Sequence, residues 1–223
     1  MRLALFTNQF PARLNTFFAR DVKALLDHGI DVEIFPIYPE DPALWDCVPD
    51  FLGESQLPRH KVHHCHLGLL GGLRSLSAGL RQPHCLPDVA RIMASSLAFG
   101  PAPLLKSVYA ALKAFRWHQV NRTEFDFVLA YWGNFSATAA YLFHRLSGSR
   151  SGFGFYLHAG VDLYRDQVFL REKLNYANVV FVVCEFNRQF IRQLYPQDFA
   201  ALNPKIQLHH LGCLLYTSPS PRD

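Results

Sequence analysis

The residues best placed to do chemistry lie in the stretch Phe155–Tyr164. An apolar aromatic run ends there in His158, a small-residue turn follows, and Asp162 stands four residues after the histidine. In an α/β protein this pattern places an imidazole at the carboxyl end of a strand, where open parallel sheets bind their ligands. Such a group can donate to a ligand hydroxyl or phosphate and can take up a proton near neutral pH. We therefore expect His158 to serve a ligand site; the alternative is a strand-end histidine bonded to its neighbours.

The loop over residues 8–16 is a second candidate. It follows an expected strand and runs into the start of a helix, whose free backbone amides and dipole favour an anion. Arg13 adds a positive charge to this loop. The alternative is a plain connection between a strand and a helix.

A histidine-rich segment over residues 60–66 could suggest a metal site. It contains four histidines and Cys65, but no second pair with recognisable zinc spacing follows. We therefore interpret these residues as the polar end of a strand that leads into the next region, and we expect no metal site. The chain also lacks the phosphate-loop, GxGxxG, HExxH and GxSxG signatures, which disfavours P-loop ATPases, typical dehydrogenases, zincins and α/β-hydrolases.

The elements that must position these residues alternate along the chain. Strands are expected over 2–7, 31–37, 126–131, 152–157, 178–183 and 205–210. Helices are expected from Asn15 or Thr16 to Gly29 and over 135–146, 166–177 and 185–194. This alternation predicts an α/β fold, a Rossmann-like parallel sheet with helices on both faces.

Composition limits the class of protein. Half of the 223 residues are hydrophobic and only 18% are charged, which excludes a disordered chain. No apolar run reaches the roughly 20 residues of a membrane span, and the first apolar run is too short for a secretory signal. The five cysteines show no CxxC spacing, so we interpret them as reduced thiols of a cytoplasmic protein.

The region 67–118 interrupts the alternation as a helical insert. It contains six Lys and Arg residues against the single carboxylate of Asp88, so it carries +5 while the whole chain carries +4. A basic, leucine-rich helical stretch can lie on an anionic membrane surface. The alternative, which we favour slightly at this point, is a solvated face on helices that cover the sheet.

The last eleven residues, 213–223, do not follow this pattern. Their back-translation resembles an adapter used in transposon-based sequencing libraries. We hypothesise that the natural reading frame is cut at Gly212 and continues into synthetic DNA. Residues 1–212 would then form the domain, and 213–223 would be a non-native tail. A natural Ser/Pro-rich tail is the alternative.

Several short motifs, taken together, resemble one family. They are Phe10-Pro11 before Arg20–Leu25, Ala130–Thr138, His158–Asp162, Glu172–Leu174, Cys184–Arg188, and Lys205-Ile206 with His209–Gly212. Their order and spacing cover nearly all of residues 1–212. They resemble retaining glycosyltransferases of family four, in the exopolysaccharide and lipopolysaccharide branch.

This resemblance implies a GT-B enzyme with two Rossmann-like domains facing across a cleft. The N-terminal domain would bind the acceptor, and a C-terminal domain absent from these residues would hold the nucleotide sugar without a metal or other cofactor. His158 would be catalytic, at the acceptor and the transferred sugar, supported by Asp162 and Glu185. The acceptor side would be formed by Phe10, Arg13, Asn15, Trp132 and Asn134. The bulky Phe10 and Arg13 depart from the glycine-rich first loop of many relatives.

The resemblance also fixes the expected partners. They are a nucleotide-sugar donor and a glycan or lipid-linked acceptor, with no nucleic acid, at the inner membrane face. The rival hypothesis is a stand-alone Rossmann-like ligand-binding module or an oxidoreductase domain. The missing GxGxxG argues against a dinucleotide.

Overall fold

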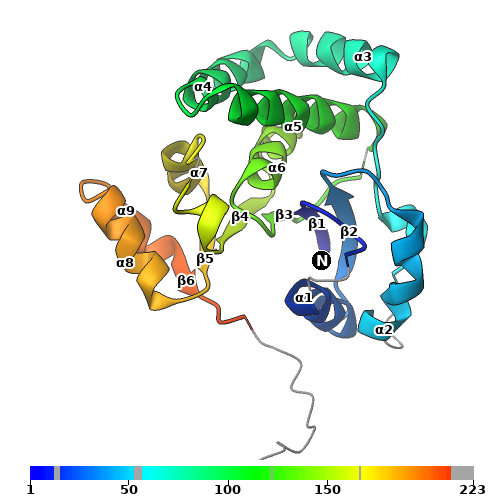
Figure 1. Cartoon of the computed structure of the whole chain (residues 1–223), viewed down its shortest axis with the longest axis horizontal. Helices are drawn as coiled ribbons and strands as arrows, with labels where there is room; N and C mark the ends of the chain where they lie inside the picture. Colours follow the sequence, from blue (N-terminus) through cyan, green and yellow to red (C-terminus); the bar gives the residue numbers. More distant parts are fainter. Residues whose placement is uncertain (13–15, 53–56, 122, 166, 212–223) are drawn as a thin grey trace, which may run out of the picture.

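Six parallel strands form the centre of the molecule, in the order β2-β1-β3-β4-β5-β6 (Figure 1). This computed structural model describes residues 1–12, 16–52, 57–121, 123–165 and 167–211. The α/β, Rossmann-like fold expected from the sequence is confirmed. The strands are β1 Arg2–Thr7, β2 Asp31–Pro36, β3 Phe127–Ala130, β4 Gly152–Leu157, β5 Val179–Val182 and β6 Ile206–Leu208.

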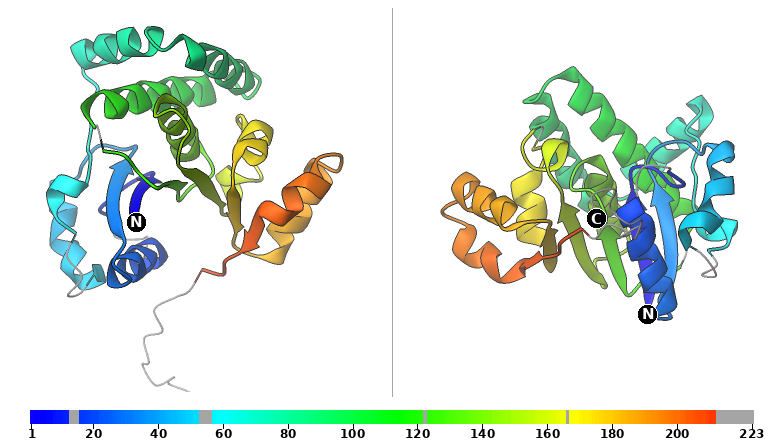
Figure 2. Two further views of the ribbon diagram at one scale, coloured as in Figure 1. Left: turned by 180° about the vertical axis from the view of Figure 1, so that it is seen from behind. Right: turned by 60° about the horizontal axis from the view of Figure 1, so that its bottom comes forward.

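Helices cover both faces of the sheet, so the inner strands β1, β3, β4 and β5 are apolar on both sides. One face carries α1 (Thr16–Asp27), the 3-10 turn η1 (Pro42–Cys47) and α2 (Val48–Leu52); the other carries α5 (Pro101–Val120) and α6 (Phe135–Leu146) (Figures 1 and 2). Alternate residues of β1 serve the two faces. Leu5 packs in the cluster of α1, whereas the ring of Phe6 lies 5.5 Å from Trp117 of α5 and 5.3 Å from Phe143 of α6.

Three further helices lie in the C-terminal half of the described chain. α7 (Leu170–Tyr176) follows β4, and α8 (Glu185–Leu194) and α9 (Phe199–Leu202) lie between β5 and β6. The helix expected over 166–177 begins only at Leu170, because Phe169 before it has a left-handed backbone with φ of 54°. The other expected ends agree closely. Gly29 ends α1 with φ of +72°, and the amide of Ile30 donates to the carbonyl of Leu25, which is a Schellman ending.

The insert folds as α3 (Leu69–Leu80), the 3-10 turn η3 (Pro83–Cys85), α4 (Leu86–Leu97) and α5. α3 and α4 form an outer layer on α5, which itself lies against α6 (Figures 1 and 2). Several of the prolines that interrupt the sequence pattern occupy the first turn of η3, α4 and α5. A proline there loses no helical hydrogen bond, so these residues begin elements and do not break them.

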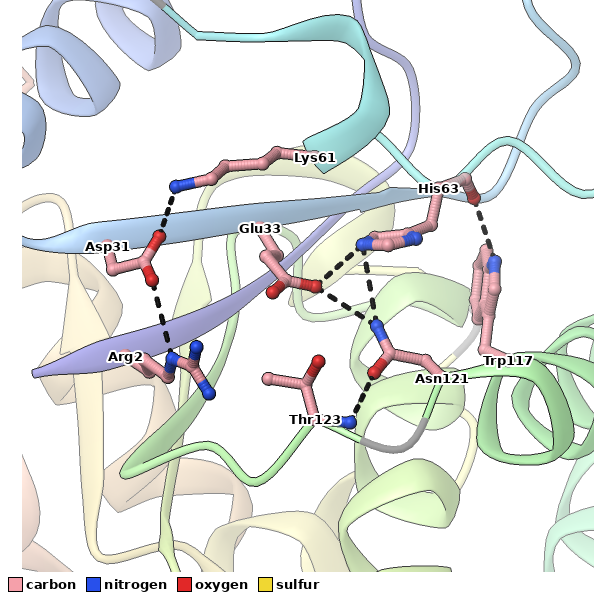
Figure 3. A network of polar contacts seen from close by, with 8 residues as sticks. All are labelled: Arg2, Asp31, Glu33, Lys61, His63, Trp117, Asn121 and Thr123. Atoms are coloured by element: carbon pink, nitrogen blue, oxygen red, sulfur yellow. Dashed lines mark hydrogen bonds and ion pairs between the residues drawn. The ribbon is translucent and has the colours of Figure 1, made fainter.

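The histidine-rich segment differs from the expected strand. It forms a 3-10 turn over Arg59–Lys61 (η2) and a single bridge from Val62 to Ile34 of β2. Side-chain contacts hold the segment where a paired strand would have backbone hydrogen bonds (Figure 3). His63 Nε2 lies 2.7 Å from Glu33 Oε2, and Trp117 Nε1 donates to the His63 carbonyl at 2.8 Å. The segment is therefore tied to the sheet edge by these polar contacts.

Candidate functional site

The site lies at the carboxyl edge of the sheet, where the strand order reverses. The chain runs from β1 to β2 on one side and returns to β3 on the other side of β1. In doubly wound folds this switch point leaves a crevice between the loops that follow the two strands. Residues 131–134 follow β3 and His158 follows β4, so the order of the strands brings the two segments together.

Aromatic rings surround His158 on several sides. The ring of Trp132 lies 4.4 Å from the imidazole, Tyr131 5.4 Å, Phe17 5.7 Å and Tyr156 5.9 Å. Phe17 comes from the first turn of α1, Tyr131 and Trp132 come from the loop after β3, and Tyr156 comes from β4. The imidazole is consequently only 5% exposed. We call this group of rings, with His158, the aromatic cage.

The cage fixes the protonation state of His158. Burial lowers the pKa of the imidazole from 6.5 to about 4, against the opposing effects of the Tyr131 carbonyl and Asp21. Nε2 lies 2.7 Å from the Tyr131 carbonyl oxygen, which can only accept, so Nε2 carries the proton. Nδ1 of the neutral ring is then a hydrogen-bond acceptor. The expectation that His158 takes up a proton near neutral pH is therefore wrong, because desolvation dominates.

Trp132 supplies a donor beside this acceptor. Its indole nitrogen is buried and makes no hydrogen bond within the described residues. A buried donor without a partner costs free energy, on the order of 1–3 kcal/mol. A ligand hydroxyl or carbonyl at this position would recover that cost. Trp132 and His158 thus offer a donor and an acceptor on neighbouring rings.

A buried lysine holds the loop that carries Trp132. Lys173 of α7 is 1% exposed, and its Nζ donates to the carbonyl of Gly133 at 2.7 Å and of Asn134 at 3.3 Å. Burial lowers the pKa of this amine to about 7, while Asp162 acts in the opposite direction. Sequence reasoning gave Lys173 no role. The available signal was a lysine between Leu170 and Leu174 on an apolar helix face.

Asp162 lies under the same loop and does not face solvent. It is 3% exposed, and burial raises the pKa of its carboxyl from 3.8 to about 6. Backbone amides of Gly133, His158 and Asn134 oppose that rise, although neither carboxylate oxygen has a hydrogen bond of ordinary geometry among the described residues. The amide contacts are therefore long or bent. The role expected for Asp162, to support His158, stays a prediction.

Asn187, near the start of α8, supports the backbone of His158. Its side chain is fully buried, and Nδ2 donates to the carbonyls of Leu157 at 3.1 Å and His158 at 3.3 Å. Its Oδ1 accepts from the Tyr164 hydroxyl at 2.6 Å. Glu185 lies two residues earlier but is exposed, and its carboxylate contacts Gln189 and Arg188 of its own helix.

The other residues predicted to bind the acceptor do not all lie beside His158. Phe10 is buried, with its ring 6.0 Å from Phe18 and 6.1 Å from Trp45, so it packs in the core beneath α1. The Asn134 side chain accepts from the amide of Ser136 at 3.3 Å and caps α6. Arg13 and Asn15 lie outside the described residues. Of the predicted acceptor residues, Trp132 is the one whose ring contacts His158.

α1 is fixed to the cage by a polar link that the sequence did not reveal. The Tyr131 hydroxyl donates to Asp21 Oδ2 at 2.5 Å, and Arg20 Nη2 donates to Asp21 Oδ1 at 2.8 Å. Burial and the Asp21 carboxylate raise the pKa of Tyr131, so the phenol stays protonated and remains a donor. This link holds Phe17, one turn earlier on α1, against the cage.

Comparisons with known proteins add no family name. The described residues contain no group of three or more His, Cys, Asp and Glu side chains that could hold a metal ion. No protein-family model matches the chain, and no curated protein matches it either.

Proposed function

We propose that residues 1–212 form the acceptor-binding domain of a retaining glycosyltransferase, which transfers a sugar from a nucleotide-sugar donor to a glycan or lipid-linked acceptor. A second Rossmann-like domain outside these residues would hold the donor. The proposal starts from the motif resemblance, and the chemistry of the cage supports it independently. It locates the enzyme in the cytoplasm, at the inner face of the membrane.

The observation that carries the proposal is the uncharged aromatic cage at the switch point. Carbohydrates present apolar C–H faces and hydroxyl groups that both donate and accept. Aromatic rings suit the first, and a neutral histidine beside an unpaired indole N–H suits the second. An anionic ligand would be served better by a protonated histidine, which the pKa of about 4 disfavours at neutral pH.

The role proposed for His158 follows from its second ring nitrogen, Nδ1, for which the described residues show no hydrogen bond. With Nε2–H committed to the Tyr131 carbonyl, Nδ1 can accept a hydrogen bond from a sugar hydroxyl. Such a contact positions the reacting sugar or acceptor without a change of charge. Asp162 and Lys173 would act indirectly, by holding the 133–134 loop and so the Trp132 ring.

A glycan array probed with the purified chain tests the proposal. We expect binding to at least one class of glycan, and loss of that binding in Trp132→Ala and in His158→Ala. Arg171→Ala is the matched control, because this exposed side chain pairs with Asp198, which is no part of the cage, and it should leave binding unchanged. Binding of a dinucleotide or a nucleoside diphosphate at the cage, with no glycan bound, would replace the proposal with a stand-alone nucleotide-binding module.

In an enzyme that also contains the donor domain, His158→Ala should lower kcat/KM about 10²–10³-fold, as expected for one polar contact made mainly in the transition state. Asp162→Asn should have a smaller effect because Asp162 acts through the loop. Activity of His158→Ala within about twofold of the parent enzyme would remove His158 from the reaction.

A further inference from the structure

The helix α3 presents its leucines to solvent and its small residues to the protein. Leu70, Leu73, Leu76 and Leu80 are 72%, 63%, 49% and 62% exposed. Ser75 and Gly79 lie on the opposite, buried side. At 100° per residue the four leucines fall on one continuous stripe. A helix packed only for this domain would have the reverse orientation.

Contacts with α5 explain why α3 cannot turn its leucines inward. A Cβ atom at Gly79 would lie 2.5 Å from the Phe115 ring of α5, so the two helices approach closely through the glycine. A leucine on this side has no room. The helix α3 belongs to the outer layer (Figures 1 and 2), and its exposed leucines therefore form part of the outer surface. Leu97 and Leu105, at the α4–α5 corner, are also exposed.

The charges beside the stripe are all positive. Arg74 and Arg81 are exposed, seven residues apart, and so lie along the same edge of the stripe. Neither has an ion-pair partner within the described residues. The insert's one carboxylate, Asp88, is 6% exposed and bonds to Arg145 Nε at 2.8 Å, so it does not offset these charges at the surface.

We propose that the leucine stripe of α3, with Arg74 and Arg81, docks on an anionic lipid bilayer. The leucines would enter the interface while the two guanidinium groups contact lipid phosphates. A second copy of the chain is a poorer occupant, because pairing two such faces would bring like charges together. No helix within the described ranges is long and apolar enough to cross a membrane, so α3 lies in the interface plane.

Flotation of the purified chain with vesicles tests this surface. We expect binding to phosphatidylcholine vesicles that contain about 30 mol% phosphatidylglycerol, and little binding to pure phosphatidylcholine. The double variant Arg74→Gln, Arg81→Gln should lower the partition coefficient about 30-fold. Each cation near an anionic surface usually adds about one kcal/mol, and about 1.4 kcal/mol corresponds to a tenfold change. Raising the salt from about 0.1 M to about 1 M should weaken binding of the parent chain in the same direction.

The apolar part is tested by Leu73→Ser with Leu80→Ser, which should weaken binding about 100-fold. Phe186→Ser on α8 is the matched control: Phe186 is 64% exposed, much like Leu73, and should not affect binding. Circular dichroism confirms that each variant is folded. Equal binding to neutral and anionic vesicles would overturn the proposal, as would parent-level binding of both double variants. A concentration-dependent dimer abolished by the leucine variant, without vesicle binding, would assign the stripe to self-association instead.

Discussion

Replacement of Gly133 by alanine tests whether the loop between Trp132 and Asn134 is as tightly held as the structure indicates. A Cβ atom at this position would lie 2.5 Å from Leu157 Cδ2 and 2.9 Å from the backbone oxygen of Tyr156. The leucine side chain can rotate away. The Tyr156 oxygen cannot, because it belongs to the central strand β4. The loop itself must therefore move.

The size of the effect follows from what the loop holds. Overpacking of this kind costs about 1–3 kcal/mol, and movement of the Gly133 carbonyl also stretches its 2.7 Å bond from the buried Lys173 amine. Gly133→Ala should therefore lower the free energy of unfolding by about 1–3 kcal/mol and Tm by about 2–12 °C. Urea and thermal unfolding followed by circular dichroism measure both quantities.

A glycine of the opposite kind gives the control. Gly72 lies within α3 and has no positive φ, and a Cβ atom added to it would meet open space among the described residues. Gly72→Ala should therefore raise stability by about 0.5–1 kcal/mol through helix propensity. The Trp132 indole N–H signal in NMR spectra should shift in Gly133→Ala and stay in place in Gly72→Ala. Equal stability of the two variants, with an unchanged Trp132 signal, would refute the tight packing of the loop.

Three further outcomes follow from the described contacts. His158 binds a proton more readily in the unfolded chain (pKa 6.5) than in the fold (pKa about 4), so the unfolded state gains protons first as the pH falls from 6.5 to 4. The free energy of unfolding should therefore fall by up to about 3 kcal/mol over this pH range. His158→Phe should reduce this dependence on pH in urea titrations at successive pH values. An NMR titration midpoint of His158 near 6.5 would contradict the burial argument. Arg145→Gln removes the 2.8 Å ion pair of the buried Asp88, which keeps the Tyr141 hydroxyl and Arg91 at 4.0 Å, and should cost about 2–3 kcal/mol. Arg171→Gln, in an exposed pair, should change the unfolding midpoint little. Residues 1–212 alone should not turn over any sugar nucleotide in a product-release assay, and turnover would place donor binding within this chain.

The sequence alone determined the six strands of the sheet and the helices α1, α6, α7 and α8 between them. The inner strands β1, β3, β4 and β5 are short, nearly continuous apolar runs bounded by polar or turn residues, and burial on both faces requires that pattern. Gly29 and Asn134 mark helix ends through local backbone chemistry, which needs no distant contact. The position of His158 at a strand end follows in the same way, since it depends only on where β4 stops.

Only the tertiary structure decided the chemical state of the site. The pKa of His158 depends on rings from α1, the loop after β3 and β4 that meet only in the folded chain, and the role of Lys173 depends on carbonyls in the 133–134 loop. The same holds for α3. Its periodicity predicts an apolar stripe but not the side on which the stripe lies, because that side is set by the close contact of Gly79 with Phe115. Local pattern fixes local structure, whereas protonation and exposure depend on neighbours that are distant in the sequence.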